Sequence, residues 1–371
     1  MVKHKMIAAG HICLDITPVF DGTRRVGEVS ELFVPGKLIN VGAADVHTGG
    51  SVANTGLALR KLGNDVKLLG KVGDDAFGAL VQKIAASYGA EGLLVDKNST
   101  TSYSVVLALP GLDRIFLHDP GANDSFCGAD IPDAELNDCE LFHFGYPPIM
   151  KRMFENDGKE LAAIFKRVRS LGIATSLDLA AVDPNTAAGR ADWETILQNT
   201  LPYVDFFVPS FEELCFMLDR ARYERLAALG GDMTEKLSVE NDVAPLAEKC
   251  IAMGAKSVLI KCGMAGLYYR TAEDFSAGER LCMDKTAWSG KEGHVPCFKA
   301  PVVLSATGAG DTCIAAFLTA AAMGKTPREC AVLAAAEGAC AVTAYDALSG
   351  LKTIGELETM LTSGWEGNDA C

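Results

Sequence analysis

Basic residues are scarce in this chain: 34 lysines and arginines are outnumbered by 48 aspartates and glutamates over 371 residues, for a net charge of −14. Nucleic acids and anionic membranes attract proteins through a cationic surface, so this balance disfavours non-specific binding to either. A phosphorylated ligand stays open, because a few backbone amides and a metal ion can hold it locally. The apolar content of 49% and the charged content of 22% are typical of a folded globular protein.

Closely spaced cysteine pairs are also missing. The sequence has 12 cysteines but no CxxC pair, which disfavours a zinc site or a thioredoxin-like site. A disulfide framework is not expected in so large a core-forming chain, so we interpret the thiols as reduced and mostly buried. Reduced thiols predict a cytoplasmic protein.

Long hydrophobic runs are absent as well. The longest apolar stretch, Ile314–Met323, is about half the length of a membrane-spanning helix. The apolar run Met6–Gly10 follows two lysines, as in a signal peptide, but His11 and Asp15 interrupt it, and we expect a first β-strand there. No internal repeat, low-complexity run or Pro- or Ser-rich linker divides the chain, so we expect a single domain over residues 1–371.

Short apolar segments alternate with amphipathic segments along most of the chain. Apolar runs predict strands at residues 6–14, 66–72, 141–144, 174–178, 203–208, 257–260 and 267–269. Helical spacing predicts helices at residues 51–62, 76–88, 161–171, 245–253 and 312–323, and another from residue 211. Because strands that alternate with helices form parallel sheets covered on both faces, we expect an α/β fold.

Four segments break this alternation. Residues 16–48, and a hairpin at residues 100–120, combine spaced apolar residues with turn residues and predict a small β-rich appendage. Residues 219–241 are charged, and residues 271–295 are polar and contain several glycines. We expect both of the latter to be surface insertions.

The strongest local motif is Ser-Ala-Thr-Gly-Ala-Gly-Asp at residues 305–311, between an expected strand at residues 302–304 and the helical run that follows. Small residues in such a turn let phosphate oxygens approach backbone N–H groups, and the helix N-terminus adds partial positive charge. Asp311 begins the helix, where the dipole favours its ionised form. A carboxylate beside a phosphate site can accept the proton of an attacking hydroxyl. Taken alone, the motif fits equally well a tight turn whose acidic residue caps the helix.

Two common nucleotide-binding motifs are absent from this turn. It lacks the third glycine of GxGxxG, and it lacks the lysine of a Walker A loop. Dinucleotide-binding and P-loop interpretations are therefore disfavoured.

A second helix that begins after glycines lies near the N-terminus. Gly49 and Gly50 precede the helix expected at residues 51–62, and Asn54 lies in its first turns. An amide at that position can both donate to and accept from sugar hydroxyls. In isolation, the same pattern is that of an ordinary helix with a polar residue near its start.

Taken together, the GG…AN…LG helix, the VGDDxFG turn at residues 72–78 and the late TGAGD motif resemble the ribokinase-like carbohydrate kinase family, which includes fructokinases and adenosine kinases. The motifs occur in that family's order and spacing, and the likeness spans roughly Met6 to Met360. The resemblance implies a three-layer α/β/α fold with a central, mostly parallel sheet. It also implies a small β-sheet lid, formed by residues 16–48 and 100–120.

The resemblance assigns roles to individual residues. Asp311 matches the catalytic base, and the backbone of Gly308, Ala309 and Gly310 matches the anion hole that holds the transferring phosphoryl group. The positions that match the family's acceptor-binding residues are Asp15, Gly49, Gly50 and Asn54.

On the nucleotide side, Ser210 and Glu213 match the family's Asn-x-x-Glu motif. Glu213 is therefore expected to act on the metal indirectly, through water. The loop that contains Lys261, Gly263 and Gly266 resembles the one lining the nucleotide site. Thr307 is expected to bind the nucleotide as well.

Three departures from the family pattern bear on function. Ser210 replaces the usual asparagine, although a hydroxyl can still bond water or phosphate. Ser305 replaces an aspartate common in the family, which puts a monovalent-cation site in doubt. Ser51 replaces the lysine of ribokinases proper and argues mildly against ribose as the acceptor.

For several other residues, a structural role is the first expectation. Asp178 ends an expected strand, where it either caps the strand or faces the cleft. Trp288 is expected in a mobile surface loop rather than against adenine. His47 and His118 belong to the lid segments, and neither is assigned to the acceptor.

These observations predict ATP- and Mg²⁺-dependent phosphorylation of a hydroxymethyl group of a small sugar, with the lid excluding water. A nucleoside kinase of the same family is an alternative, with Phe116, Phe144 and Tyr146 as candidates for a shelf under the base. A non-catalytic sugar- or nucleotide-sensing protein on the same scaffold is the other. The expected partners are small molecules, without nucleic acid or membrane, and the resemblance allows a homodimer through the lid.

Overall fold

The computed structural model describes residues 3–20, 27–112, 114–344 and 346–365. Its centre is an eight-stranded sheet with the strand order β14-β13-β12-β11-β10-β9-β1-β4. Six strands run parallel: β1 (Lys5–Gly10), β4 (Asp65–Leu69), β9 (Leu141–Gly145), β10 (Ala174–Leu177), β11 (Phe206–Phe207) and β12 (Ser257–Lys261). Two antiparallel strands, β13 (Leu267–Thr271) and β14 (Glu292–Val295), complete one edge.

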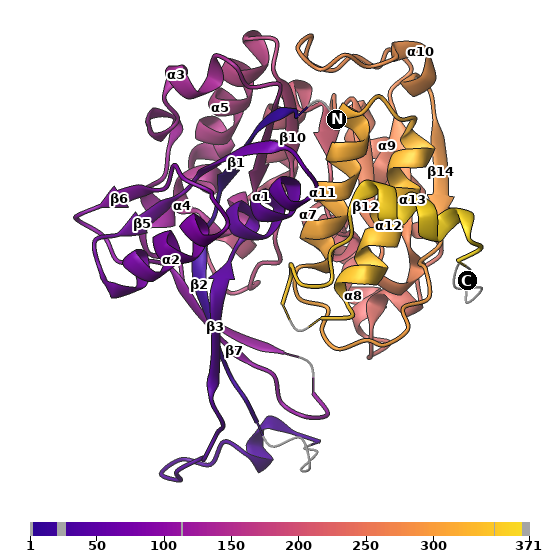
Figure 1. The fold of residues 1–371 in the computed structure, drawn as a ribbon. Helices are drawn as coiled ribbons and strands as arrows, with labels where there is room; N and C mark the ends of the chain where they lie inside the picture. The colour runs from indigo at the N-terminus through magenta and orange to yellow at the C-terminus, as the bar shows by residue number, and fades with distance from the viewer. Residues whose placement is uncertain (1–2, 21–26, 113, 345, 366–371) are drawn as a thin grey trace.

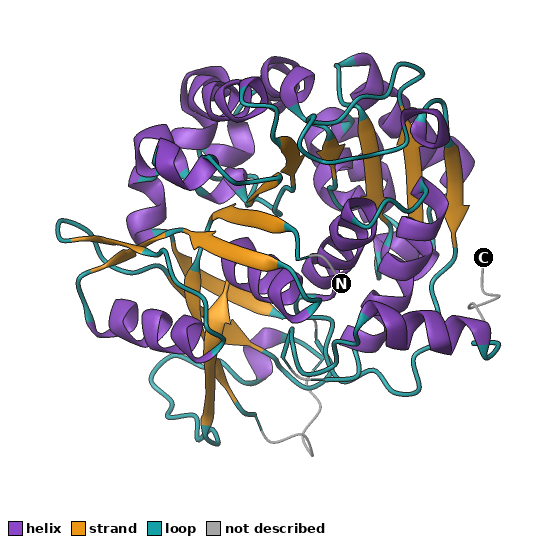
Figure 2. Ribbon diagram, turned by 45° about the horizontal axis from the view of Figure 1, so that its top comes forward, coloured by secondary structure: helices purple, strands orange, loops and turns teal. Residues whose placement is uncertain are grey.

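Helices cover both faces of this sheet (Figure 2). Alternate residues of β1 enter separate cores: Met6 and Ala8 pack on one face, and Ile7 and Ala9 pack on the other. The first core includes residues of α1 (Ser51–Lys61), α2 (Ala76–Ser87), α10 (Lys285–Trp288), α11 (Ala309–Ala322), α12 (Pro327–Ala341) and α13 (Ile354–Thr362). The second includes residues of α3 (Asp133–Leu136), α4 (Lys151–Phe154), α5 (Lys159–Ser170), α6 (Trp193–Thr200), α7 (Phe211–Leu218), α8 (Arg220–Ala227) and α9 (Ala244–Ala252). The predicted three-layer α/β/α fold is confirmed.

A smaller, four-stranded sheet extends away from the body (Figure 1). Its strands, in spatial order, are β3 (Ala44–Gly49), β2 (Cys13–Pro18), β7 (Tyr103–Leu107) and β8 (Ile115–Asp119). We call this sheet the lid. A separate two-stranded sheet pairs β5 (Lys71–Gly73) with β6 (Leu94–Asp96). Within the ranges described above, no helix is long and apolar enough to span a membrane.

Two predicted strands are each divided in the structure. The strand predicted at residues 6–14 ends at Gly10, and the chain then enters the lid as β2. Gly10 has a φ of 119°, and a Cβ there would lie 2.3 Å from the Gly145 carbonyl oxygen, so the chain can turn closely against β9 only at a glycine. The strand predicted at residues 66–72 is likewise divided into β4 and β5.

The two predicted surface insertions contribute to the cores, so that expectation was wrong. Residues 219–241 form α8 and bury Leu226 and Met233. Residues 271–295 contain α10 and the sheet strand β14. Trp288 is 1% exposed and stacks on Phe275 with ring centroids 4.9 Å apart, so it is a core residue and not part of a surface loop.

The strand predicted at residues 302–304 is absent from the described structure of that segment. Val302, Val303 and Leu304 are 48%, 67% and 41% exposed. Apolar composition alone suggested a strand there, but the amides of Leu304 and Ser305 instead donate to the Val342 carbonyl, beyond the end of α12.

Candidate active site

Polar side chains, including the predicted site residue Lys261, gather where the parallel strands end. His11 follows β1, Tyr146 follows β9, Asp178 follows β10, and Lys261 is the last residue of β12. In parallel α/β sheets, the carboxyl ends of the strands lie at one edge, which is the usual place for a ligand. A cleft of about 940 Å³ opens at this edge, and Asp15, Asn54, Thr307, Gly308 and Asp311 are among its lining residues.

Asp311 is held by three donors from distant parts of the chain. Its Oδ1 accepts a hydrogen bond from the Thr55 hydroxyl at 3.0 Å. Its Oδ2 accepts from the Asn54 side-chain amide at 3.1 Å and from the Tyr146 hydroxyl at 2.8 Å. The carboxylate is therefore oriented at the cleft wall rather than used as a helix cap, and no cap hydrogen bond is found at Gly308.

The surroundings of Asp311 differ from the expectation that the helix dipole decides its charge. Asp311 is only 4% exposed, and burial raises its pKa. The nearby Lys261 ammonium limits this rise, as do the hydrogen bonds from Tyr146, Asn54 and Thr55. Ionisation thus depends on these neighbours, and not on the position at the helix start alone.

Gly308 shapes the turn before α11. It is the N-cap of the helix, with φ 72° and ψ 0°, and a Cβ there would lie 2.2 Å from the Ala347 Cβ. Only glycine fits this left-handed, crowded position. The amide of Ala309 donates to the Ala306 carbonyl at 3.3 Å, so one of the three predicted anion-hole amides is partly engaged within the turn. Gly310 lies beside the Lys261 side chain.

The lid reaches this turn. The Arg114 guanidinium, next to β8, donates to the Thr307 hydroxyl. The Ser305 hydroxyl donates to the same hydroxyl at 3.0 Å and accepts from the Thr307 amide at 3.1 Å. A lid cation and the predicted phosphate turn are thereby brought together.

On the acceptor side, Asp15 lies in β2 opposite the start of α1. A Cβ at Gly49 would lie 2.1 Å from Asp15 Oδ2, so the glycine makes room for this carboxylate. The Cys13 thiol donates to Asp15 Oδ1 at 3.3 Å, and His47 Nε2 lies 4.0 Å from Asp15 Oδ2. Gly50 has a φ of 82° and lies against the buried His11.

A buried ion pair lies at the ends of β10 and β12. Lys261 Nζ is 2.8 Å from Asp178 Oδ1, and Asp178 is 2% exposed. Burial raises the pKa of Asp178 despite its lysine partner. Although burial alone would lower the pKa of Lys261, the carboxylates of Asp178 and Glu213 raise it. Asp178, which the sequence left open between two roles, pairs with the only predicted site lysine.

Ser210 and Glu213 form a capping box at the start of α7. The Ser210 hydroxyl accepts from the Glu213 amide at 3.3 Å, and Glu213 Oε2 accepts from the Ser210 amide at 2.8 Å. Glu213 also lines the cleft, whereas Ser210 is not among the described lining residues. Gly263 and Gly266 lie in the turn after β12, outside the described lining of the cleft.

Sequence reasoning missed Thr55 and the hydrogen bond of Tyr146, and its suggestion of Phe144 for a shelf was wrong. Thr55 is fully buried and meets Asp311 across 256 positions, a contact with no local signal. Tyr146 bonds the same carboxylate, although it was considered only as part of a shelf. Phe144, from the same expected shelf, is fully buried in the core, while Phe116 and His118 line the cleft.

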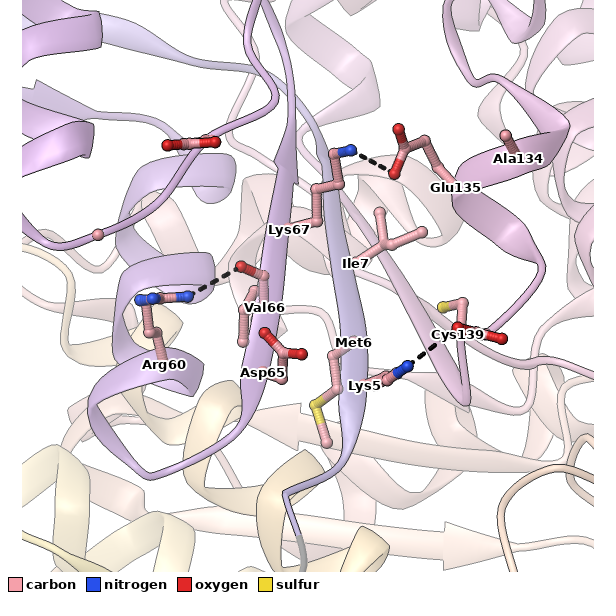
Figure 3. Close-up of a pocket in the computed structure, with 13 residues that line it drawn as sticks. Lys5, Met6, Ile7, Arg60, Asp65, Val66, Lys67, Ala134, Glu135 and Cys139 are labelled. Carbon is pink, nitrogen blue, oxygen red and sulfur yellow. Dashed lines mark hydrogen bonds and ion pairs between the residues drawn. The ribbon is translucent and has the colours of Figure 1, made fainter.

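A second depression, of about 410 Å³, lies at the opposite ends of the strands, where Lys5 begins β1 and Asp65 begins β4 (Figure 3). Both of its lysines are paired locally: Lys5 Nζ lies 2.9 Å from Asp138, and Lys67 pairs with Glu135. It contains none of the predicted site residues. The cleft at the carboxyl ends is therefore the candidate active site.

Comparison with known proteins identifies the family of this chain. The profile of the pfkB family carbohydrate kinases matches residues 15–354. A ribokinase of Arabidopsis thaliana is 25% identical over 326 residues, which are 86% of this chain and 74% of that protein.

Two solved structures show the same fold. The Arabidopsis thaliana ribokinase complexed with ribose and ATP aligns with a TM-score of 0.70 at 22% identity, over 97% of this chain and 99% of that one. A ribokinase II from E. coli, solved in complex with ATP and Mg²⁺, aligns with a TM-score of 0.67 at 20% identity, over 97% and 99%.

Proposed function

The chain belongs to the pfkB family of carbohydrate kinases, which are phosphotransferases, and on that premise we propose that it transfers the γ-phosphoryl group of ATP to a hydroxymethyl group of a small sugar. The observation that supports this most is the buried carboxylate of Asp311, oriented by three donors in the cleft that also contains Asp15 and Asn54. We treat residues 1–371 as one kinase domain and place the protein in the cytoplasm, as the sequence predicts.

The donor groups at the start of α11 fit the phosphates of a nucleoside triphosphate. The first N–H groups of a helix lack intrahelical partners and attract anions. The Thr307 hydroxyl and the Arg114 guanidinium lie at the same turn, and Lys261 lies beside Gly310. These groups would hold the phosphates, with Gly263 and Gly266 nearer the nucleoside.

The carboxylates also fit a magnesium ion. Mg²⁺ usually binds one or two carboxylates together with substrate phosphates and waters, and Glu213 lines the cleft. When bound, it would offset the charge of the phosphate oxygens.

Ser305, already engaged with Thr307, supplies no carboxylate for a monovalent cation. Turnover should therefore differ little between Na⁺ and K⁺ buffers, and strong saturable activation by K⁺ would contradict this.

Different residues of the cleft then have different roles in the reaction. Asp15 and the free groups of the Asn54 amide hold the acceptor hydroxyls. Asp311 takes the proton of the attacking hydroxyl, and the anion hole steadies the phosphoryl group. Closure of the lid over the cleft excludes water as a competing acceptor.

An apolar wall favours one alternative acceptor. Phe116, Tyr146, Ile149 and Phe154 all line the cleft. Such a wall could support a nucleobase, so a nucleoside kinase of the same fold is the second candidate.

A coupled assay of ADP release over ketoses, aldoses, sugar acids and nucleosides tests the proposal. We expect turnover with one class of sugar. Turnover with nucleosides alone would favour the second candidate. If no acceptor in the panel causes release of ADP, both candidates are contradicted.

The matched control in this screen is Asp311→Asn, which preserves shape and removes the proton acceptor. General-base assistance is worth about 10²–10⁴-fold, so we expect a loss of kcat of that size with ATP binding nearly unchanged. Wild-type turnover in this variant would rule out Asp311 as the base.

We also propose that two copies of the chain pair through the lid. Val46 and Leu117 are 39% and 55% exposed on its strands, and the strand pairing places both on the face of the lid opposite Asp15 and His118. A second copy would cover these apolar groups. Light scattering should give twice the monomer mass, and Leu117→Lys should lower it; a monomer at all concentrations would contradict the pairing.

A further inference from the structure

Tyr146 occupies an unusual backbone position directly after β9. Its φ and ψ are 65° and 39°, in the left-handed region, and it is one of three non-glycine residues with positive φ in the described chain. Pro147 and Pro148 follow it. A residue before proline avoids the right-handed helical region, and the left-handed conformation costs about 1–2 kcal/mol for a residue with a Cβ. The surrounding structure therefore maintains this conformation at a cost.

The strained conformation directs the side chain at Asp311. The Tyr146 hydroxyl donates to Oδ2 at 2.8 Å, and the Asn54 amide donates to the same oxygen at 3.1 Å. The other oxygen, Oδ1, accepts from the Thr55 hydroxyl at 3.0 Å. Thr55 is fully buried and lies outside the described lining of the cleft, whereas Tyr146 and Asn54 belong to that lining. Oδ2 is thus the oxygen on the cleft side, and two donors hold it in place.

The charged groups around Asp311 come from several elements. Lys261 of β12 favours its ionised form. Asp178 after β10 and Glu213 of α7 are negative neighbours of the same cluster, while α1 contributes only the neutral Asn54 and Thr55. Burial, followed by the charge of Asp311, raises the pKa of Tyr146 well above its usual value. Tyr146 therefore remains a protonated donor over the working range of pH.

We propose that Tyr146 is a positioning residue for the catalytic base: by donating to Oδ2 together with Asn54, it fixes the orientation of the Asp311 carboxylate and stabilises its ionised form. This inference rests on the proposed function. In the step, the O–H bond of the acceptor breaks and its proton binds the Asp311 carboxylate. The acceptor oxygen forms a bond to the γ-phosphorus, the bond from that phosphorus to the bridging oxygen breaks, and ADP leaves with that electron pair. Tyr146 keeps its own proton throughout.

The variant Tyr146→Phe removes only the hydroxyl. Without this donor, ionised Asp311 loses one stabilising hydrogen bond, which for a charged acceptor corresponds to a factor of about ten or more. We expect kcat on the acid side of the pH profile to fall by about that factor, with the KM for ATP unchanged. The acid limb of the pH profile of kcat/KM for the acceptor should move up by about one unit.

Tyr269→Phe is the matched control, because Tyr269 is a buried tyrosine of β13 outside the described lining of the cleft. It should leave the acid limb unchanged. An unchanged limb and unchanged kcat in Tyr146→Phe would overturn the proposal. Faster turnover would overturn it too, because the contact would then be inhibitory.

A second readout does not need turnover. Removal of a donor to ionised Asp311 destabilises only the ionised folded state. The difference in Tm between wild type and Tyr146→Phe should therefore grow as the pH rises through the pKa of Asp311. A difference that is constant with pH would overturn the proposal. If the Tm difference grows with pH in this way but the wild type phosphorylates no acceptor, the result would instead contradict the proposed function.

Discussion

Two carboxylates in the cleft have different surroundings, and these suit different tasks. Asp311 is almost fully buried and accepts three hydrogen bonds from side chains. The Asp15 side chain is 14% exposed and lies near His47 of the lid. A buried carboxylate with a raised pKa is suited to accept a proton. A more open carboxylate beside glycine is suited to bind hydroxyls.

The variant Asp15→Ala tests the second task. A hydrogen bond to a charged group contributes about 1.5–3 kcal/mol, so we expect kcat/KM for the acceptor to fall by a factor of about 10–150. Steady-state kinetics with varied acceptor and fixed ATP would measure this fall. An unaltered kcat/KM with a true substrate would remove Asp15 from the acceptor site.

At the scale of an element, the start of α11 combines two glycines with different roles. Gly308 is left-handed and meets Ala347 closely, whereas a Cβ at Gly310 would make only ordinary contacts, at 3.6 Å or more, with Lys261. Ala347 belongs to the segment before Lys352, whose amide donates to the buried Glu337 of α12 at 3.0 Å. The turn therefore depends on packing from the C-terminal part of the chain.

This contrast predicts opposite effects on stability. Gly308→Ala should lower the free energy of unfolding by about 1–2 kcal/mol from its backbone conformation alone, with the clash in addition. Gly310 lies within a helix, so Gly310→Ala should raise the free energy of unfolding by up to about 1 kcal/mol. Denaturant unfolding of both variants would measure the pair. If the two variants were equally stable, the close packing and left-handed backbone of Gly308 would be contradicted.

For the molecule as a whole, buried acids make stability depend on pH. Burial raises the pKa of Glu337 from 4.5 to about 8, and the hydrogen bond from Lys352 only partly offsets this. Burial raises the pKa values of Asp178 and Asp311 as well. Between the unfolded and folded pKa values, the folded protein binds more protons, so its stability falls as the pH rises.

We therefore expect Tm to decline from about pH 5 to pH 8. Over this range the unfolding free energy should fall by at most about 1.4 kcal/mol per pH unit for each such group. Glu337→Gln keeps the shape and removes the charge, so the decline should become shallower without disappearing. Thermal melts across this range would test it. A variant with the same slope as wild type would show that Glu337 does not titrate in this range.

Several features of the fold were predictable because their signals are local. The helix at residues 51–62, the helix at residues 76–88 and the hairpin at residues 100–120 follow from the spacing of apolar residues and from turn residues, and the structure confirms them within three residues. The alternation of strands and helices predicted the layered α/β fold for the same reason. The motif at residues 305–311 placed Asp311 at a helix start through glycine chemistry that acts over a few positions.

The sequence by itself thus determined most of the elements and the layers, and it predicted Asp311 as the base. Only the tertiary structure decided that Trp288 is in the core, that Asp178 pairs with Lys261, and that Thr55 and Tyr146 hold Asp311. The contacts of Lys261 and Asp311 join segments 83 to 256 positions apart, and no local pattern encodes which strand ends meet at one edge of the sheet. The charge of Asp311 belongs to the same class, because burial and neighbours that the chain brings together only on folding decide its pKa, rather than its place in the sequence.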